Sequence, residues 1–149
     1  MYDNFNTALS KSLQTEKLVI DFMSTQGWVF MGNNSDFRYD LRFWIPDIGI
    51  RLIELKHDYI THKTNNLAIE YSSRGKESGI NTTKSDYYMF FLDKLNELWM
   101  ITTKNLRSLI AVNLFKKING GDEGSNTLFY LIPKDEFKEN FIIWKVRGI

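Results

Sequence analysis

The chain has 149 residues, and its 19 basic and 18 acidic side chains leave a formal net charge of +1. This length predicts a single domain over residues 1–149, and the absence of cysteine excludes disulfide bonds and thiolate zinc sites. No apolar run approaches the roughly 20 residues of a membrane span, so we expect no membrane partner, and attraction to nucleic acid would have to come from a local basic patch.

The N-terminal part of the chain predicts one helix followed by a short strand. Apolar residues recur near helical spacing from about residue 12 to residue 26, and Gly27 provides a natural stop. Residues before this stretch are expected to be loosely packed, while Glu16 stands in its first half. Residues 28–30 predict a strand or a core anchor, and the composition of residues 32–36 predicts a loop.

Residues 39–56 predict a β-hairpin, around which the rest of the chain is organised. Two β-rich runs flank Pro46-Asp47-Ile48-Gly49, where proline presets φ and glycine tolerates a positive φ. Asp47 therefore belongs to the turn. Seven residues of strand, at about 3.3 Å each, would separate it from Glu54 by roughly 20 Å.

Charged side chains are expected to converge at the open end of this hairpin. A turn centred on its two middle residues sets Asp40 opposite Glu54 or Leu55, and both alternatives are open. Side chains alternate along a strand, so Glu54 and Lys56 project from one face. Two carboxylates and an ammonium group would then lie together. A strand end that is otherwise rich in Ile and Leu gains nothing in packing from such a cluster.

The chemistry of such a cluster indicates phosphodiester hydrolysis. Two carboxylates a few ångströms apart repel one another and favour a hard divalent cation between them. Magnesium typically accepts one or two protein carboxylates and fills its other positions with water and phosphate oxygens. A neighbouring lysine can orient the attacking water and stabilise the charge that develops on the phosphorane.

Asp40 followed by Glu54-Leu55-Lys56 on the next strand resembles the PD-(D/E)XK nuclease superfamily. That group includes many restriction enzymes, archaeal Holliday-junction resolvases and small phage endonucleases. The resemblance continues in residues 66–71 and 74–88, which are similar to a phage-encoded branch, and it spans roughly residues 12–115. It implies an α/β fold with a restriction-endonuclease-like core, in which α-helices flank a mixed central β-sheet.

The resemblance also implies an activity and roles for the clustered residues. The activity would be Mg²⁺-dependent hydrolysis of DNA by an endonuclease of phage type, with Mn²⁺ able to substitute. Asp40 and Glu54 would bind the metal together with the backbone carbonyl of Leu55, and Lys56 would position the hydrolytic water. No proline precedes Asp40, which departs from the name of the superfamily.

Two further acids match metal-site positions of the resembling enzymes. Glu16 matches an acidic residue that completes the metal site from the first helix in the resolvase branch. Residues 67–71 alternate as a third strand with Glu70 on the face away from its apolar side chains, where relatives keep a polar residue beside the metal. A solvated helix glutamate and an edge glutamate paired with lysine are the alternatives.

Residues 72–84 are the best candidate for contacts with nucleic acid, because basic and hydroxyl side chains surround two glycines. A plain surface loop is the alternative, since Glu77 dilutes the charge. The candidate side chains are Arg74, Lys76, Ser78, Thr83 and Lys84. Lys104 and Arg107, further along the chain, could extend this basic face.

The remaining chain predicts alternating strands and short helices. His57 and His62 fall in a polar connection, residues 57–66, and are expected to be solvated. A second Glu-x-Lys, Glu136-Phe137-Lys138, is expected on a short helix, where positions i and i+2 do not share a face. The other predicted elements are strands at 87–92, 97–101, 127–132 and 141–146, a helix capped by Thr103 and ending near Val112, a flexible acidic loop at 119–126 and a helical turn at 134–140.

Two other functional hypotheses remain beside the nuclease. One is a catalytically silent DNA-binding or assembly module, with which the near-neutral net charge is compatible. The other is a structural protein in which Lys56 merely pairs with Glu54, although an exposed pair contributes little. As a nuclease the chain would act on DNA in the cytoplasm, that of the host if it is phage-encoded, and cutting both strands would favour a two-fold homodimer.

Overall fold

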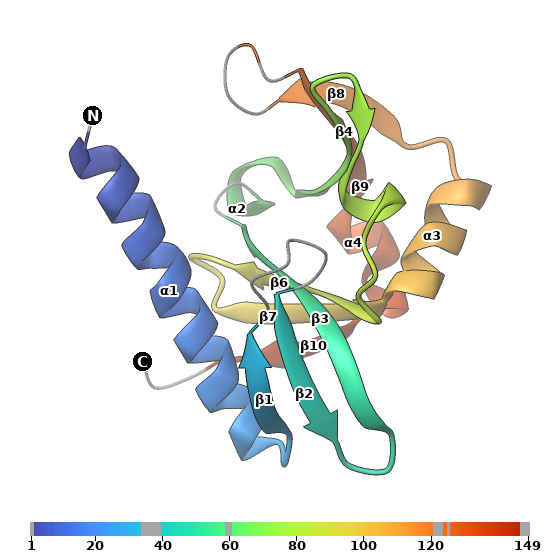
Figure 1. Cartoon of the computed structure of the whole chain (residues 1–149). Coiled ribbons are helices and arrows are strands. Elements are labelled where there is room, and N and C mark those ends of the chain that lie inside the picture. The colour runs from blue at the N-terminus through green and yellow to red at the C-terminus, as the bar shows by residue number, and fades with distance from the viewer. Residues whose placement is uncertain (1, 34–39, 59–60, 121–123, 125, 147–149) are drawn as a thin grey trace.

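The computed structural model describes residues 2–33, 40–58, 61–120, 124 and 126–146 (Figure 1). The fold is mixed α/β and contains a six-stranded mixed sheet and a four-stranded antiparallel sheet. Within these described ranges, no helix is long and apolar enough to cross a membrane.

The two sheets and the helices have the following bounds. The six-stranded sheet has the order β1 (Val29–Asn33), β2 (Leu41–Ile45), β3 (Gly49–Asp58), β6 (Tyr87–Leu92), β7 (Glu97–Thr102) and β10 (Ile142–Lys145). The four-stranded sheet has the order β5 (Lys76–Glu77), β4 (Asn66–Ser73), β9 (Thr127–Pro133) and β8 (Lys116–Gly120). The helices are α1 (Tyr2–Thr25), α2 (Thr61–Thr64), α3 (Thr103–Val112) and α4 (Lys134–Phe137), with 3₁₀ turns at Gly79–Asn81 and Lys138–Asn140.

The predicted hairpin is confirmed as β2 and β3. Its turn is closed by a hydrogen bond from Ile48 N to Ile45 O at 3.1 Å, and Asp47 and Gly49 both adopt positive φ, at 65° and 101°. The antiparallel register sets Leu41 opposite Ile53. Turn geometry fixes such a register, so the residue before β2, Asp40, comes beside Glu54 rather than Leu55.

The predicted mixed sheet is confirmed, but the sequence did not predict which strands belong to it. β3 pairs in parallel with β6, while β4 pairs with β9 and β5 in the second sheet. The sequence predicted the strand that carries Glu70 but not its sheet, which is distinct from that of the hairpin. Leu67 and Ile69 of β4 are buried in a separate core, and this burial draws the strand away from β3.

Alternate residues of β6 face two different hydrophobic cores. Met89 and Phe91 pack into a first core beneath α1, whereas Tyr88, Phe90 and Leu92 pack into a second core between the two sheets. The second core also receives apolar side chains from α3. The nearly continuous apolar run was predicted to be a strand covered on both faces, and the structure confirms it.

The helix boundaries required two corrections. α1 begins at Tyr2, so the helix starts about ten residues before the predicted stretch, while the side chains of residues 1–12 lie outside the described part of the chain. Neither glycine nor proline interrupts residues 2–25, and nothing stops the helix from extending. α3 is capped by Thr102 rather than Thr103, because the Thr102 side chain accepts a hydrogen bond from Asn105 N at 3.0 Å.

The polar connection after the hairpin is more ordered than we predicted. β3 continues through Asp58, whose Oδ1 accepts a hydrogen bond from Thr61 N at 2.7 Å at the start of α2. His57 lies on this strand, bonds to Thr15 of α1 and approaches Asp93 Oδ1 at 3.5 Å. The expectation of a solvated His57 is wrong, while the side chain of His62 lies outside the described residues.

Two strands were absent from the sequence prediction. β8 is a solvated edge with polar side chains and lacks the apolar alternation of its neighbours, and β5 is a two-residue strand inside the predicted loop 72–84. Part of the expected loop at 119–126 lies outside the described residues, and so does most of the loop expected at 32–36. The predicted final strand is confirmed as β10.

Candidate active site

Asp40, Glu54 and Lys56 come together at the open end of the β2–β3 hairpin. The Oδ2 atom of Asp40 accepts a hydrogen bond from Leu55 N at 2.7 Å, and the Asp40 carboxyl group lies near enough to Glu54 to raise the pKa of Glu54. The Nζ atom of Lys56 lies 3.8 Å from Oε1 of Glu54. The structure therefore brings together the three side chains that the sequence pattern singled out.

Glu54 is the electrostatic centre of this group. Its side chain is 9 % exposed, whereas that of Lys56 is 45 % exposed. Burial raises the pKa of Glu54 from its ordinary 4.5 to about 7, Lys56 opposes this rise, and the nearby Asp40 adds to it. A neighbouring carboxylate favours the protonated form of such a group. A buried, partly protonated glutamate of this kind is typical of a functional site.

Glu16 approaches the pair from α1. Its carboxylate accepts a hydrogen bond from the side-chain amide of Asn33 on β1. Partial burial raises the pKa of Glu16, the bond from Asn33 lowers it, and the charge of Asp40 raises it. Glu16 therefore lies within electrostatic reach of Asp40, on the side of the hairpin that α1 covers.

Glu70 approaches the pair from the second sheet. Its charge contributes to the raised pKa of Glu54, and a register shift in the β4–β9 pairing begins at this residue. Gly79 packs directly on its backbone: φ is +54°, and a Cβ there would come 2.1 Å from Glu70 O. This close approach, which requires glycine, helps to hold Glu70 in place.

The donor atoms suit a hard divalent cation. Carboxylate and carbonyl oxygens are the ligands that Mg²⁺ accepts. The Leu55 carbonyl points to the same side of β3 as its N–H, which faces Asp40. Among the residues described, no three His, Cys, Asp or Glu side chains already form a metal-holding group.

The predicted nucleic-acid segment is only partly available to a ligand. Arg74, Lys76 and Lys84 are exposed. Thr83 is buried and its hydroxyl shares a 2.8 Å hydrogen bond with Ser85, while the hydroxyl of Ser78 is enclosed. Thr83 and Ser78 are therefore not positioned to contact a phosphate, because the Thr83 hydroxyl bonds within the protein and the Ser78 hydroxyl is shielded from solvent.

The structure adds two residues that the sequence did not connect with the site. Arg107 of α3 donates from Nε to Ile80 O and from Nη2 to Thr83 O, both at 3.0 Å. Tyr88 of β6 is paired with Glu54 in the parallel register. A tyrosine within an apolar strand predicts only a core position, so nothing in the sequence indicated that Tyr88 lies near Glu54. Arg107 was expected only as part of a basic face.

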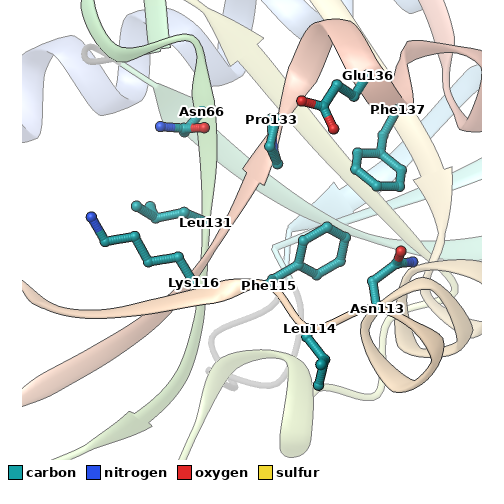
Figure 2. A pocket seen from close by; sticks show the side chains of 9 residues that line it. All are labelled: Asn66, Asn113, Leu114, Phe115, Lys116, Leu131, Pro133, Glu136 and Phe137. Carbon is teal, nitrogen blue, oxygen red and sulfur yellow. The ribbon is translucent and has the colours of Figure 1, made fainter.

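Two open pockets lie outside the carboxylate group. One, of about 380 Å³, is lined by none of the candidate acids, and two of its lining residues, Phe115 and Phe137, pack edge to face with ring centroids 5.1 Å apart (Figure 2). The other, of about 410 Å³, is lined by polar side chains, among them Asp86, which lies two residues before Tyr88 in the sequence. Its lining residues are Ser85, Asp86, Thr103, Lys104, Arg107 and Ser108.

Comparison of the chain with models of protein families finds no match, and comparisons with curated proteins and with solved structures find none either. The function is therefore inferred from the arrangement of the side chains themselves.

Proposed function

We propose that the protein is a Mg²⁺-dependent nuclease of the PD-(D/E)XK type that hydrolyses phosphodiester bonds of DNA as an endonuclease. The observation that carries this proposal is the meeting of Asp40, Glu54 and Lys56 at one end of a hairpin. Burying a glutamate beside a second carboxyl group destabilises the fold. A functional requirement accounts for that cost better than packing does.

The side chains divide the chemical work between them. Asp40, Glu54 and the carbonyl of Leu55 would hold Mg²⁺, which when bound activates water and neutralises phosphate charge. The exposed ammonium group of Lys56 reaches from Glu54 toward solvent, where it orients the attacking water and stabilises the charge developing on phosphorus. The water oxygen bonds to phosphorus while the bond to one sugar oxygen breaks, and that oxygen leaves with a proton. Glu16 and Glu70 are the additional acids for a second ion.

The architecture supports a restriction-endonuclease-like core. A helix, α1, precedes the strands β1, β2 and β3, and β6 then adds to the sheet in parallel with β3 (Figure 1). α1 packs on one face of this mixed sheet and α3 on the other. A mixed sheet flanked by helices is what the resemblance predicts, and the carboxylates lie where the pairing of β2 with β3 ends.

Basic side chains offer a path for the DNA backbone beside the carboxylates. Arg107 and Lys104 line the polar pocket that begins two residues from Tyr88, and the exposed Arg74, Lys76 and Lys84 lie on the segment that Arg107 fastens to α3. Because phosphate contacts draw on such groups, this local patch would compensate for a net charge of only +1.

A cleavage assay with a matched pair of variants tests the proposal. Supercoiled plasmid, linear duplex, single strand and branched junctions are incubated with the protein in Mg²⁺ and in EDTA. We expect cleavage only with Mg²⁺, and its loss in Asp40→Asn. Asp47→Asn is the control, because Asp47 lies exposed in the turn and asparagine tolerates its positive φ. No cleavage of any substrate in Mg²⁺, or equal loss in both variants, would contradict the proposal.

One observation favours a second candidate, a DNA-binding module without turnover. The pKa of Glu54 is raised to about 7, so the proton that it retains can offset the repulsion from Asp40 without an ion. This candidate predicts equal DNA binding in Mg²⁺ and in EDTA, measured by fluorescence anisotropy, with no product under either condition. Binding that strengthens with Ca²⁺ would argue against it.

A further inference from the structure

Tyr88 carries a buried hydroxyl group beside the proposed catalytic glutamate. It pairs with Glu54 across the parallel β3–β6 ladder, and its side chain is 2 % exposed. Within the described part of the chain, its hydroxyl oxygen has no hydrogen-bond partner. Buried polar groups are nearly always paired, and leaving one unpaired costs free energy, so each exception calls for an explanation.

Charged groups from four separate segments act on this hydroxyl. They are Glu54 of β3, Glu70 of β4, Asp40 before β2, and Arg107 of α3. Burial, reinforced by the charge of Glu54, raises the pKa of Tyr88 far above its usual range. The hydroxyl therefore keeps its proton and can act as a hydrogen-bond donor. The nearby groups that raise its pKa are carboxylates, which can accept such a bond.

We propose that Tyr88 is a positioning residue, whose hydroxyl donates a hydrogen bond to the Glu54 carboxylate in the working state of the site. This inference rests on the proposed nuclease function. Enclosure of the hydroxyl oxygen keeps it from direct contact with a DNA phosphate, so Tyr88 acts through Glu54. Groups that orient a metal ligand from behind commonly affect metal affinity and activity by roughly 10- to 100-fold.

A purely structural tyrosine predicts a different behaviour. Its ring packs tilted against Phe90 at 5.8 Å between centroids, within the second hydrophobic core. If only the ring matters, phenylalanine should replace Tyr88 with no loss of function. If the hydroxyl serves the site, phenylalanine should raise stability, because an unpaired polar group is removed, and should lower metal affinity and turnover.

The experiment uses Tyr88→Phe, with Tyr87→Phe as the matched control. Tyr87 is the preceding residue on β6 and packs against the first core, on the opposite face. For Tyr88→Phe we expect a higher melting temperature of the metal-free protein, roughly tenfold weaker Mn²⁺ binding by calorimetry and roughly tenfold lower kcat with KM for DNA unchanged. Tyr87→Phe should leave Mn²⁺ binding and kcat as in the wild type.

A double-mutant cycle identifies the acceptor. In a Glu54→Gln background, the effect of Tyr88→Phe on Mn²⁺ affinity should disappear, because two residues that act through one contact are not additive. An undiminished effect in that background would overturn Glu54 as the acceptor. Wild-type Mn²⁺ affinity in Tyr88→Phe, with or without a gain in stability, would overturn the inference altogether.

The calorimetric measurement separates this inference from the proposed function. If the wild-type protein cleaves no DNA but Tyr88→Phe still weakens Mn²⁺ binding, the nuclease proposal fails and the role of Tyr88 at Glu54 stands. If the wild type cleaves DNA and both tyrosine variants match it, the nuclease proposal stands and the role of Tyr88 is refuted. A wild type that binds no Mn²⁺ refutes both.

Discussion

The chain contains the pattern Glu-x-Lys twice, in two regions with opposite environments. Glu54 and Lys56 lie on β3, where alternate residues share a face, and their charged atoms are 3.8 Å apart. Glu136 lies on α4 and Lys138 begins the following 3₁₀ turn, and both are exposed. The same tripeptide pattern thus forms a cluster only where the backbone period places its charges side by side.

Burial separates the two copies further. Glu54 is 7 % exposed and lies near a second carboxyl group, that of Asp40. Burial and the charge of Asp40 both raise the pKa of Glu54. Glu136 lines an open pocket together with Leu131 and Pro133 of β9 (Figure 2). The comparison shows that the Glu-x-Lys pattern forms a candidate site only where the glutamate is buried beside a second charged group. The pattern of residues alone is insufficient.

The largest expected difference between the two copies is in turnover. Lys56→Ala should lower DNA cleavage at least about 100-fold, or about 2.7 kcal/mol in activation free energy, because it removes a charge from the transition state. Lys138→Ala should cleave like the wild type in the same plasmid assay with Mg²⁺. Unchanged cleavage by Lys56→Ala would remove this lysine from the mechanism and abolish the contrast.

The next difference is in how stability depends on pH. The folded metal-free protein holds the Glu54 proton more tightly than the unfolded chain, with a pKa of about 7 against 4.5. Stability is therefore highest below pH 4.5 and falls as the pH rises toward 7. Between pH 5 and 8 the free energy of unfolding should fall by a few kcal/mol from this group.

Urea denaturation in EDTA at several pH values measures this dependence. Glu54→Gln should flatten the curve above pH 5, because it removes the titrating carboxyl group. Glu136→Gln should leave the curve unchanged, since an exposed glutamate contributes no comparable term. A wild-type stability that stays level from pH 5 to pH 8 would show that Glu54 is not desolvated as the structure indicates.

Substitution of the two glutamates should affect metal affinity differently, but by a smaller factor than substitution of the two lysines affects turnover. Glu54→Gln removes one anionic oxygen ligand and should weaken Mn²⁺ or Ca²⁺ binding at least about tenfold, or about 1.4 kcal/mol. Glu136→Gln should bind the ion like the wild type in calorimetry. Equal affinities for the two variants would argue against Glu54 as a ligand.

The smallest expected effect concerns Glu16, which stands at the margin of the cluster. Its carboxylate is only partly buried and already accepts a hydrogen bond from Asn33. Glu16→Gln should reduce cleavage by roughly threefold, as expected for a partly screened charge. Asp21→Asn, an exposed acid on the same helix, is the control. A loss as large as that of Lys56→Ala would make Glu16 a principal ligand.

Local patterns predicted the hairpin correctly, and long-range pairing explains most of the errors. The turn signals around Asp47 set a register that brought Asp40 beside Glu54. The sheet of the strand carrying Glu70 was not predicted, because its partner β9 lies about sixty residues away in the chain. The edge strand β8 lacks the apolar alternation of its neighbours, so its sequence did not predict a strand.

The sequence by itself determined which charged residues share the end of the hairpin, because a turn and a period of two act over only seventeen residues, 40–56. Only the tertiary structure decided that Glu54 is desolvated, that Glu70 faces it from a second sheet and that Tyr88 lies beside it. Each of these depends on packing between segments far apart in the chain. Burial and the sharing of charge follow from that packing, which no local pattern encodes.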